Sequence, residues 1–191
     1  MENQYFAAST IFLIHTLFGL YILVVMLRLM LQWVRADFYN PISQFIVKVT
    51  NPPLKPMRRI IPGWGGIDFA SVILLIALQI MELFLVNVAL GHAAGIGGLF
   101  FQSIAELIGL LINIFIGAII IQVILSWIAP GTYNPLIGLV YKISEPALKP
   151  FRRIIPPVAG IDFSPLAALI VMQLLKILIV APIANFGLTL G

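Results

Sequence analysis

Apolar residues dominate four long stretches of the chain, and most of the charged residues lie between them. The stretches lie near residues 7–31, 69–90, 104–128 and 163–184. A helix that crosses a bilayer needs about 20 mostly apolar residues, so each stretch predicts one transmembrane helix. We therefore expect an all-α integral membrane protein with four transmembrane helices.

One segment of the sequence occurs twice. Residues 31–79 reappear 94 positions later as residues 125–173, and about 22 of the 49 aligned pairs are identical without a gap. The identical pairs include lysine, arginine, proline, asparagine and aspartate, which a shared membrane composition alone does not produce. We predict two units of the same fold, residues 1–94 and residues 95–191.

Charge predicts how these units are oriented. Only 9% of the residues are charged, and nine of the eleven Lys and Arg residues lie between the first and second or the third and fourth apolar stretches. Loops rich in Lys and Arg stay in the cytoplasm, so we expect both long loops there and both termini in the periplasm. The two units then form parallel helical hairpins, and their net charge of +4 faces anionic lipid.

Each long loop predicts an amphipathic helix. Asn40-Pro41 and Asn134-Pro135 match an N-cap followed by proline at the first helical position, and apolar residues recur after both at helical spacing. Such helices suit the headgroup layer or the surface of the helix bundle. We expect Pro52-Pro53 and Pro146 to end them, because proline interrupts the hydrogen bonding of a helix. A short basic turn closed by proline follows each.

Six basic residues in these loops form the candidate contact surface for anionic lipid or for a partner. They are Lys55, Arg58, Arg59, Lys149, Arg152 and Arg153. The simpler interpretation is that they only set the topology and touch lipid headgroups. Asp68 and Asp162 directly precede apolar stretches and are predicted N-caps, with pairing to the nearby arginines or ion binding as alternatives.

Ionisable residues inside apolar spans are costly and are candidates for function. They are His15, Arg28, Glu82, Glu106 and Lys176. We expect Arg28 to extend to the cytoplasmic boundary. Glu82 and Lys176 hold equivalent positions, each 14 residues after its aspartate and thus about 21 Å along its helix. We hypothesise that they pair across the two units.

The alternative to this pair is that Lys176 extends outward while Glu82 is protonated or faces another subunit. The amides Gln79 and Gln173 are identical in both units. We expect them to form hydrogen bonds between helices, with contact to a substrate as the alternative.

The pattern favours no catalytic, metal or cofactor site. It contains no cysteine and no arrangement of nucleophile and base, metal ligands or phosphate-binding loop. The spacing of His15 and His92 does not favour haem ligation, and the basic residues are too few for a nucleic-acid surface. Gly95, Gly97 and Gly98 predict a flexible turn between the two units.

The duplicated string of charges and prolines resembles the YggT family. The residues that carry the resemblance are Asn134-Pro135, Glu145-Pro146, Leu148-Lys149-Pro150, Arg152-Arg153-Ile154-Ile155-Pro156 and Gly160-Ile161-Asp162-Phe163-Ser164-Pro165. The tandem form with four spans is similar to that of Gram-negative bacteria, whereas YlmG-type relatives carry one copy. The resemblance implies a small inner-membrane or thylakoid-membrane protein without an established catalytic activity.

Roles suggested for such relatives are osmotic and potassium stress tolerance, division-site and nucleoid organisation, and assembly of b-type cytochrome. We therefore predict a non-enzymatic inner-membrane scaffold or assembly factor that acts through its duplicated basic loops. Its expected partners are anionic lipid headgroups and a membrane protein or a second copy of the chain, and neither a nucleic acid nor a known small-molecule substrate. The alternative is a small oligomeric ion or solute transporter of osmotic or potassium homeostasis.

Overall fold

The chain folds into helices joined by short connections. The computed structural model describes residues 2–93, 95–128, 131, 134–158 and 160–190. Its elements are α1 (Glu2–Trp33), α2 (Pro41–Ile60), α3 (Phe69–Leu90), α4 (Ile96–Ile128), α5 (Pro135–Ile154), α6 (Ser164–Leu175), the π-helix η1 (Lys176–Val180) and α7 (Ala181–Thr189).

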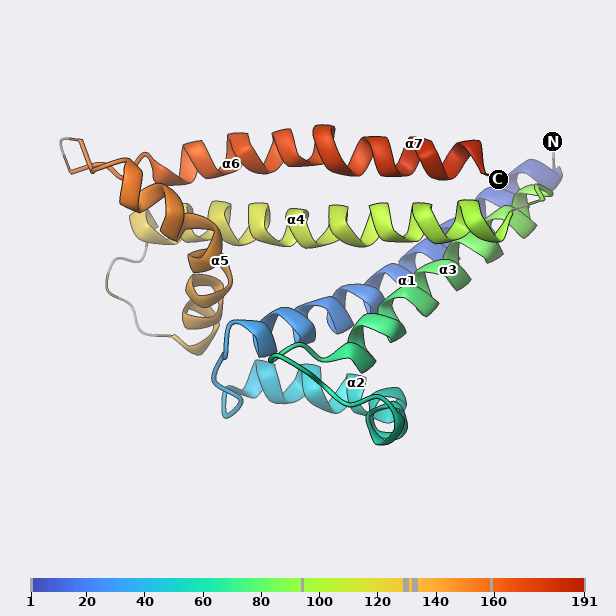
Figure 1. Cartoon of the computed structure of the whole chain (residues 1–191), viewed down its shortest axis with the longest axis horizontal. Coiled ribbons are helices and arrows are strands. Elements are labelled where there is room, and N and C mark those ends of the chain that lie inside the picture. The colour runs from blue at the N-terminus through green and yellow to red at the C-terminus, as the bar shows by residue number, and fades with distance from the viewer. Residues whose placement is uncertain (1, 94, 129–130, 132–133, 159, 191) are drawn as a thin grey trace.

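Four helical segments are long and apolar enough to cross a membrane: α1, α3, α4 and the continuous run Ser164–Thr189. Figure 1 shows both termini and the α3–α4 connection at one end of the molecule, with α2 and α5 toward the other. α1 and α4 therefore run in one direction, and α3 and α6–α7 return. The predicted fold of two parallel helical hairpins is confirmed.

Of the three glycines expected in a turn between the units, Gly95 lies in the connection before α4, whereas the other two lie in a helix. Gly97 and Gly98 lie inside α4, which begins at Ile96 and not near residue 104 as expected. A Cβ atom on Gly187 of α7 would lie 3.1 Å from the Gly98 carbonyl oxygen and 2.9 Å from Cγ of Gln102. The two helices thus approach closely here, which small residues permit in membrane proteins.

The fourth span contains a widened turn at its ionisable residue. In η1, the N–H of Ala181 donates to the carbonyl of Lys176, five residues earlier. Pro182 follows and lacks an N–H, so it cannot complete the next regular helical hydrogen bond. Single π turns of this kind recur within helices, and here the turn lets the span continue to Thr189.

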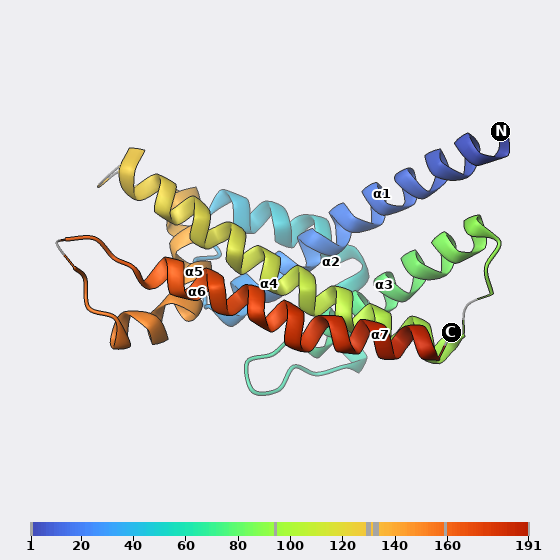
Figure 2. The ribbon, with the colours of Figure 1, turned by 90° about the horizontal axis from the view of Figure 1, so that it is seen from above.

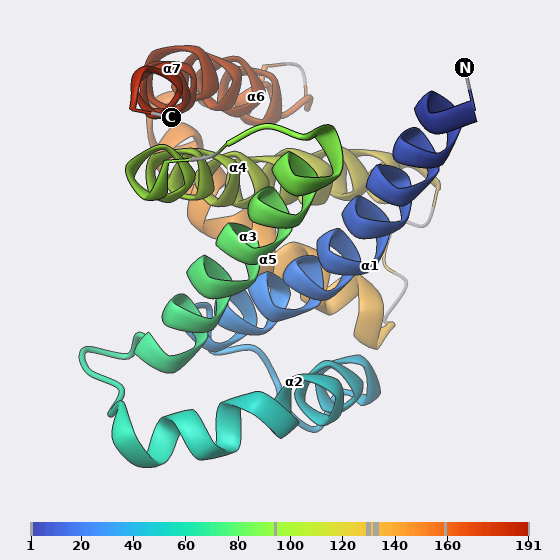
Figure 3. The same cartoon turned by 90° about the vertical axis from the view of Figure 1, so that its right-hand side faces the viewer.

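α2 and α5 continue through the prolines that were expected to end them. Each is 20 residues long and ends at equivalent isoleucines, Ile60 and Ile154. Pro52, Pro56 and Pro150 lie on exposed positions, where a carbonyl without a helical partner can still be solvated. The helices bend instead of ending, and Figure 3 shows the change of direction in α2.

The amphipathic helices pack against the bundle. Leu54 of α2 and Leu148 of α5 hold equivalent positions, and both are almost fully buried together with Ile22 and Ile119 of the spans. In contrast, the first turns of α1 stand apart from the other helices (Figure 2), and no residue from 5 to 20 is buried. Fully buried large side chains, such as Met30, Leu54 and Leu148, thus occur toward the end of the molecule that carries α2 and α5.

We predict that Gly187→Ala loosens the packing of α7 on α4. The added methyl group would overlap α4, and overpacking of this kind costs about 1–3 kcal/mol. The matched control is Gly117→Ala in α4, because a Cβ atom there would meet nothing within 4 Å. Thermal unfolding in mild detergent should show a lower midpoint for Gly187→Ala alone. Equal midpoints would contradict the close approach of the two helices.

Candidate functional site

Asparagine side chains start both amphipathic helices and bring these starts together. The side-chain oxygen of Asn40 accepts from the N–H of Ile42, and that of Asn134 accepts from the N–H of Leu136, both at 2.9 Å. Each asparagine thus satisfies an N–H that the first helical turn leaves free. Asn40 also donates through Nδ2 to the Pro135 carbonyl at 2.7 Å, which links the two units.

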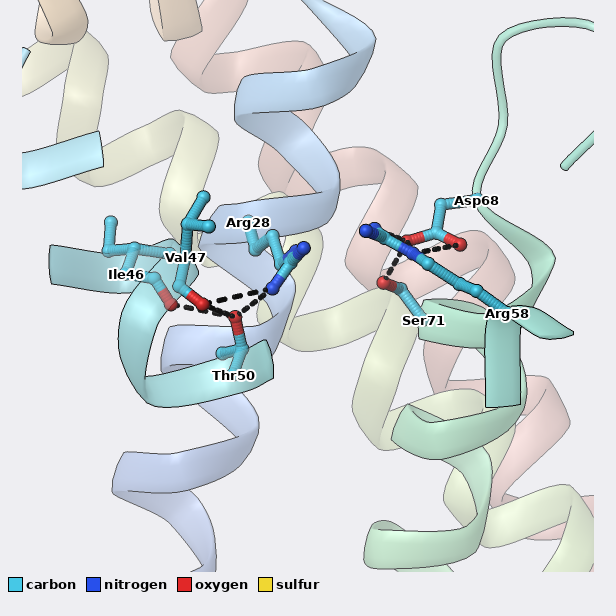
Figure 4. A network of polar contacts seen from close by, with 7 residues as sticks. All are labelled: Arg28, Ile46, Val47, Thr50, Arg58, Asp68 and Ser71. Carbon is cyan, nitrogen blue, oxygen red and sulfur yellow. Dashed lines mark hydrogen bonds and ion pairs between the residues drawn. The ribbon is translucent and has the colours of Figure 1, made fainter. Parts of the chain in front are cut away.

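A polar side chain of the preceding span anchors each amphipathic helix. Nη1 of Arg28 donates to Oγ1 of Thr50 at 2.5 Å and to the Val47 carbonyl at 3.3 Å (Figure 4). The equivalent residues in the second unit are Gln122 and Ser144, and the Ser144 hydroxyl donates to the Gln122 side chain. Arg28 is only 5% exposed, and its guanidinium reaches the amphipathic helix α2 rather than solvent.

An arginine–aspartate pair closes the connection that follows each amphipathic helix. Arg58 donates to both carboxylate oxygens of Asp68, and the Ser71 hydroxyl donates to Asp68 at 2.5 Å (Figure 4). In the second unit Nε of Arg152 lies 3.0 Å from Oδ2 of Asp162. The same positions form the same pair in both units, as the alternative interpretation of the aspartates predicted.

The two aspartates differ in how they serve the next helix. Asp68 holds the N-cap position of α3, but its side chain makes no capping hydrogen bond. The prediction that the Asp68 side chain caps the helix is therefore wrong. Asp162 lies one residue before the N-cap of α6 and accepts from the N–H of Ser164 at 2.9 Å. Asp68 is bound to Arg58 and Ser71 instead, because both donors reach it inside the fold.

Two of the six predicted surface cations form ion pairs within the chain. Arg58 pairs with Asp68, and Arg152 pairs with Asp162 and also with Glu145 at 2.9 Å. The other four are exposed and form no ion pair among the residues that the structure describes. They are Lys55, Arg59, Lys149 and Arg153. Each unit therefore presents one lysine and one arginine at equivalent positions.

Four polar residues of the spans gather where α1, α3 and α4 come together. Nδ1 of His15 lies 2.7 Å from Oε1 of Glu82. Nε2 of Gln79 donates to Oε2 of Glu82 at 3.0 Å and to Oε2 of Glu106 at 2.6 Å. The contact between Gln79 and Glu106 joins the first unit to the second. We call these four residues the intramembrane cluster.

The hypothesised pair of Glu82 and Lys176 does not form. Glu82 bonds within the intramembrane cluster, while Nζ of Lys176 donates to Oδ1 of Asn113 at 3.0 Å. Gln173 is exposed and makes no side-chain hydrogen bond within the described part of the chain, unlike its equivalent Gln79. The two units contact each other through α3 and α4. Glu82 and Lys176 therefore do not meet, although they hold equivalent positions in the two units.

No group of three or more His, Cys, Asp or Glu side chains among the described residues is arranged to hold a metal ion. The sequence marked His15 and Glu106 as ionisable residues of spans but did not place them with Glu82. Their juxtaposition depends on how α1, α3 and α4 cross, which helical periodicity does not encode.

Known proteins contain the same repeated unit as this chain. The CCB3/YggT family matches the chain twice, over residues 7–89 and 101–183. The chain belongs to the CCB3/YggT family. Among its relatives, the uncharacterized protein PA0392 of Pseudomonas aeruginosa is 47% identical over 180 residues, covering 92% of this chain and 90% of that protein.

Other relatives differ in whether they match both repeat units of this chain or only one. The uncharacterized protein YggT of Escherichia coli K12 is 38% identical over 168 residues, with 86% of each chain covered. The protein ycf19 of Guillardia theta is 34% identical over 79 residues, which is 82% of ycf19 but 41% of this chain. One unit of the duplicated fold therefore accounts for most of that relative. No solved structure matches the chain significantly.

The environment of the arginine–aspartate pairs shifts the titration of both aspartates. Burial alone would raise the pKa of Asp68, but hydrogen bonds from Arg58 and Ser71 outweigh it and lower the pKa below its usual value. Burial would likewise raise the pKa of Asp162. Hydrogen bonds from Ser164 and Arg152 outweigh this effect and lower the pKa below its usual value. The Asp68 side chain is 4% exposed and that of Asp162 is 40% exposed.

We predict that Asp68→Asn destabilises the protein more than Asp162→Asn. The first change leaves Arg58 without its buried partner and costs about 1–3 kcal/mol, whereas exposed pairs contribute little. Because the folded-state pKa of Asp68 is lowered, its stabilisation is present at neutral pH and is lost as pH falls below about 4. Thermal unfolding across this pH range tests both points, and equal losses for the two variants would contradict the difference in burial.

Proposed function

We propose that this protein is a non-enzymatic inner-membrane scaffold or assembly factor that binds a membrane-protein partner through its two basic helices. The observation that supports this role is the pair of exposed cations on each unit, Lys55 with Arg59 and Lys149 with Arg153. Because Arg58 and Arg152 hold the connections in place, these cations occupy fixed and equivalent positions. A duplicated, rigidly held surface suits docking of a partner with acidic segments.

Exposed apolar residues next to these cations support the same role. Ile60 and Ile154 follow Arg59 and Arg153 directly and are 84% and 77% exposed. A cation beside an exposed aliphatic side chain is typical of surfaces that contact another protein or the membrane interface. The proposed orientation follows from the basic residues, with α2 and α5 in the cytoplasm and both termini in the periplasm.

We predict that Arg59→Glu combined with Arg153→Glu abolishes capture of the partner. The variant reverses one exposed cation in each unit without touching either arginine–aspartate pair. Tagged protein is extracted from native membranes in mild detergent, and co-purifying proteins are quantified by mass spectrometry. We expect a defined set of proteins to fall at least about tenfold, because like charges across an interface are strongly disfavoured.

The matched control is Lys48→Glu combined with Lys142→Glu. These lysines are also equivalent and exposed, but they lie nearer the start of each helix. Both variants carry the same net charge, so a general electrostatic effect would change them equally. Equal loss of partners in both variants, or no loss in the first, would contradict docking at the proposed surface. Retention of all partners with loss of anionic lipid alone would show that the surface contacts only the bilayer.

A further inference from the structure

The intramembrane cluster places three ionisable groups in the apolar part of the fold. Glu82 and Gln79 are buried at 4% and 5% exposure, whereas His15 and Glu106 lie on the outer surface of the helix bundle. That surface belongs to α1 and α4, two of the helices long and apolar enough to cross a membrane, and we therefore infer that it faces lipid rather than water. A net charge in such a place is costly, and the cluster must therefore balance its charges internally.

The geometry shows how this balance is reached. His15 Nδ1 and Glu82 Oε1 are 2.7 Å apart, so one proton between them makes the pair neutral overall, whichever atom holds it. Glu106 has no such basic partner. Its only side-chain hydrogen bond among the described residues comes from the amide of Gln79 at 2.6 Å. A second proton, carried by Glu106 itself, leaves the whole cluster neutral.

Gln79 makes the two carboxyl groups interdependent. Its side-chain nitrogen donates to Oε2 of Glu82 and to Oε2 of Glu106, so both of its N–H groups are used. If Glu106 lost its proton while Glu82 was ionised, two negative charges would flank one neutral amide. Two like charges repel one another in such a place, and their repulsion would push α3 and α4 apart.

Among the described residues, no basic group forms an ion pair with Glu106 that could replace the second proton. On α1 the only other basic residue is Arg28, 13 residues from His15 and thus about 20 Å along the helix. On α3 the nearest other ionisable residue is Asp68, which Arg58 already neutralises. Among the segments packed on α4, η1 carries Lys176, which donates a hydrogen bond to Asn113. Asn113 is seven residues from Glu106, or about 10 Å along the helix. α6 and α7 carry no charged residue. α2 and α5 lie toward the other end of the molecule (Figure 1).

We propose that His15, Glu82 and Glu106 form a membrane-embedded proton-binding site that joins the two units. Glu106 carries one proton at neutral pH, and the His15–Glu82 pair shares another. The ligand is a proton rather than a metal ion, since the three side chains are not arranged as metal ligands. Release of the Glu106 proton weakens the contact between α3 and α4. This site is independent of the proposed docking surface at the basic helices.

The test is infrared spectroscopy of the purified full-length protein in lipid vesicles. A protonated carboxyl group has a carbonyl band that an ionised one lacks, and glutamate in water is ionised above about pH 4.3. We expect the band to be present at pH 7, to be lost in Glu106→Gln, and to remain in Glu145→Gln. Glu145 is the matched control because it is an exposed glutamate on α5. A band that is absent at pH 7, or unchanged in Glu106→Gln, would overturn the proposal.

A second pair of variants keeps every acid and so remains informative if Glu106→Gln does not fold. Gln79→Leu removes the hydrogen bond to Glu106 and should shift the position of the band. Gln173→Leu changes the equivalent, exposed residue of the second unit and should not shift it. A band that neither variant moves would belong to another carboxyl group. Loss of the band on adding Na⁺ or K⁺ at constant pH would identify a metal-cation site and overturn the proton assignment.

Discussion

In each unit, an arginine–aspartate pair joins the end of the amphipathic helix to the start of the second span and so positions the exposed cations near it. Arg58 is two residues from the end of α2 and Asp68 directly precedes α3, so their pair fixes the connection between two helices. Within that connection Trp64 and Ile67 exchange backbone hydrogen bonds around Gly65 and Gly66, whose φ angles of 64° and 83° suit a tight turn. Val158 and Ile161 exchange the same bonds in the second unit. The exposed cations of α2 and α5 are consequently held at equivalent places.

The two units share a backbone but differ in chemistry. Where the first unit buries Arg28 against Thr50, the second uses Gln122 and Ser144. The substitution of a neutral amide for a buried cation makes the second anchor independent of charge. Asp162 is likewise much more exposed than Asp68. The repeat thus conserves the positions that define the fold, while its first copy buries charge and its second copy does not.

The features that depend on local sequence were predictable. Hydrophobic run length located the four spans, and Asn40 and Asn134 marked where α2 and α5 begin. The ends of those helices were not predictable, since packing Leu54 and Leu148 into the core stabilises helices that continue through their internal prolines. The sequence also did not predict that Gly97 and Gly98 lie within a helix, because the packing there depends on Gly187, some 90 residues away. Contacts distant in sequence decided each of these cases.

The intramembrane residues illustrate the limit of arguing from repeat equivalence. Glu82 and Lys176 are related by the duplication and share a depth, yet each bonds elsewhere, to His15 and to Asn113. The reason is geometric: α3 meets α4, the first helix of the next unit, whereas α6 and η1 lie on another side of α4 (Figure 1). A carboxylate between α1 and α4 requires a partner on one of those helices. His15 fulfils that requirement, and Glu106 accepts a hydrogen bond from Gln79. Neither has a counterpart in the repeat, since their equivalent positions are Gly109 and Phe12. The polar link between the two units is therefore built from residues that the duplication did not preserve.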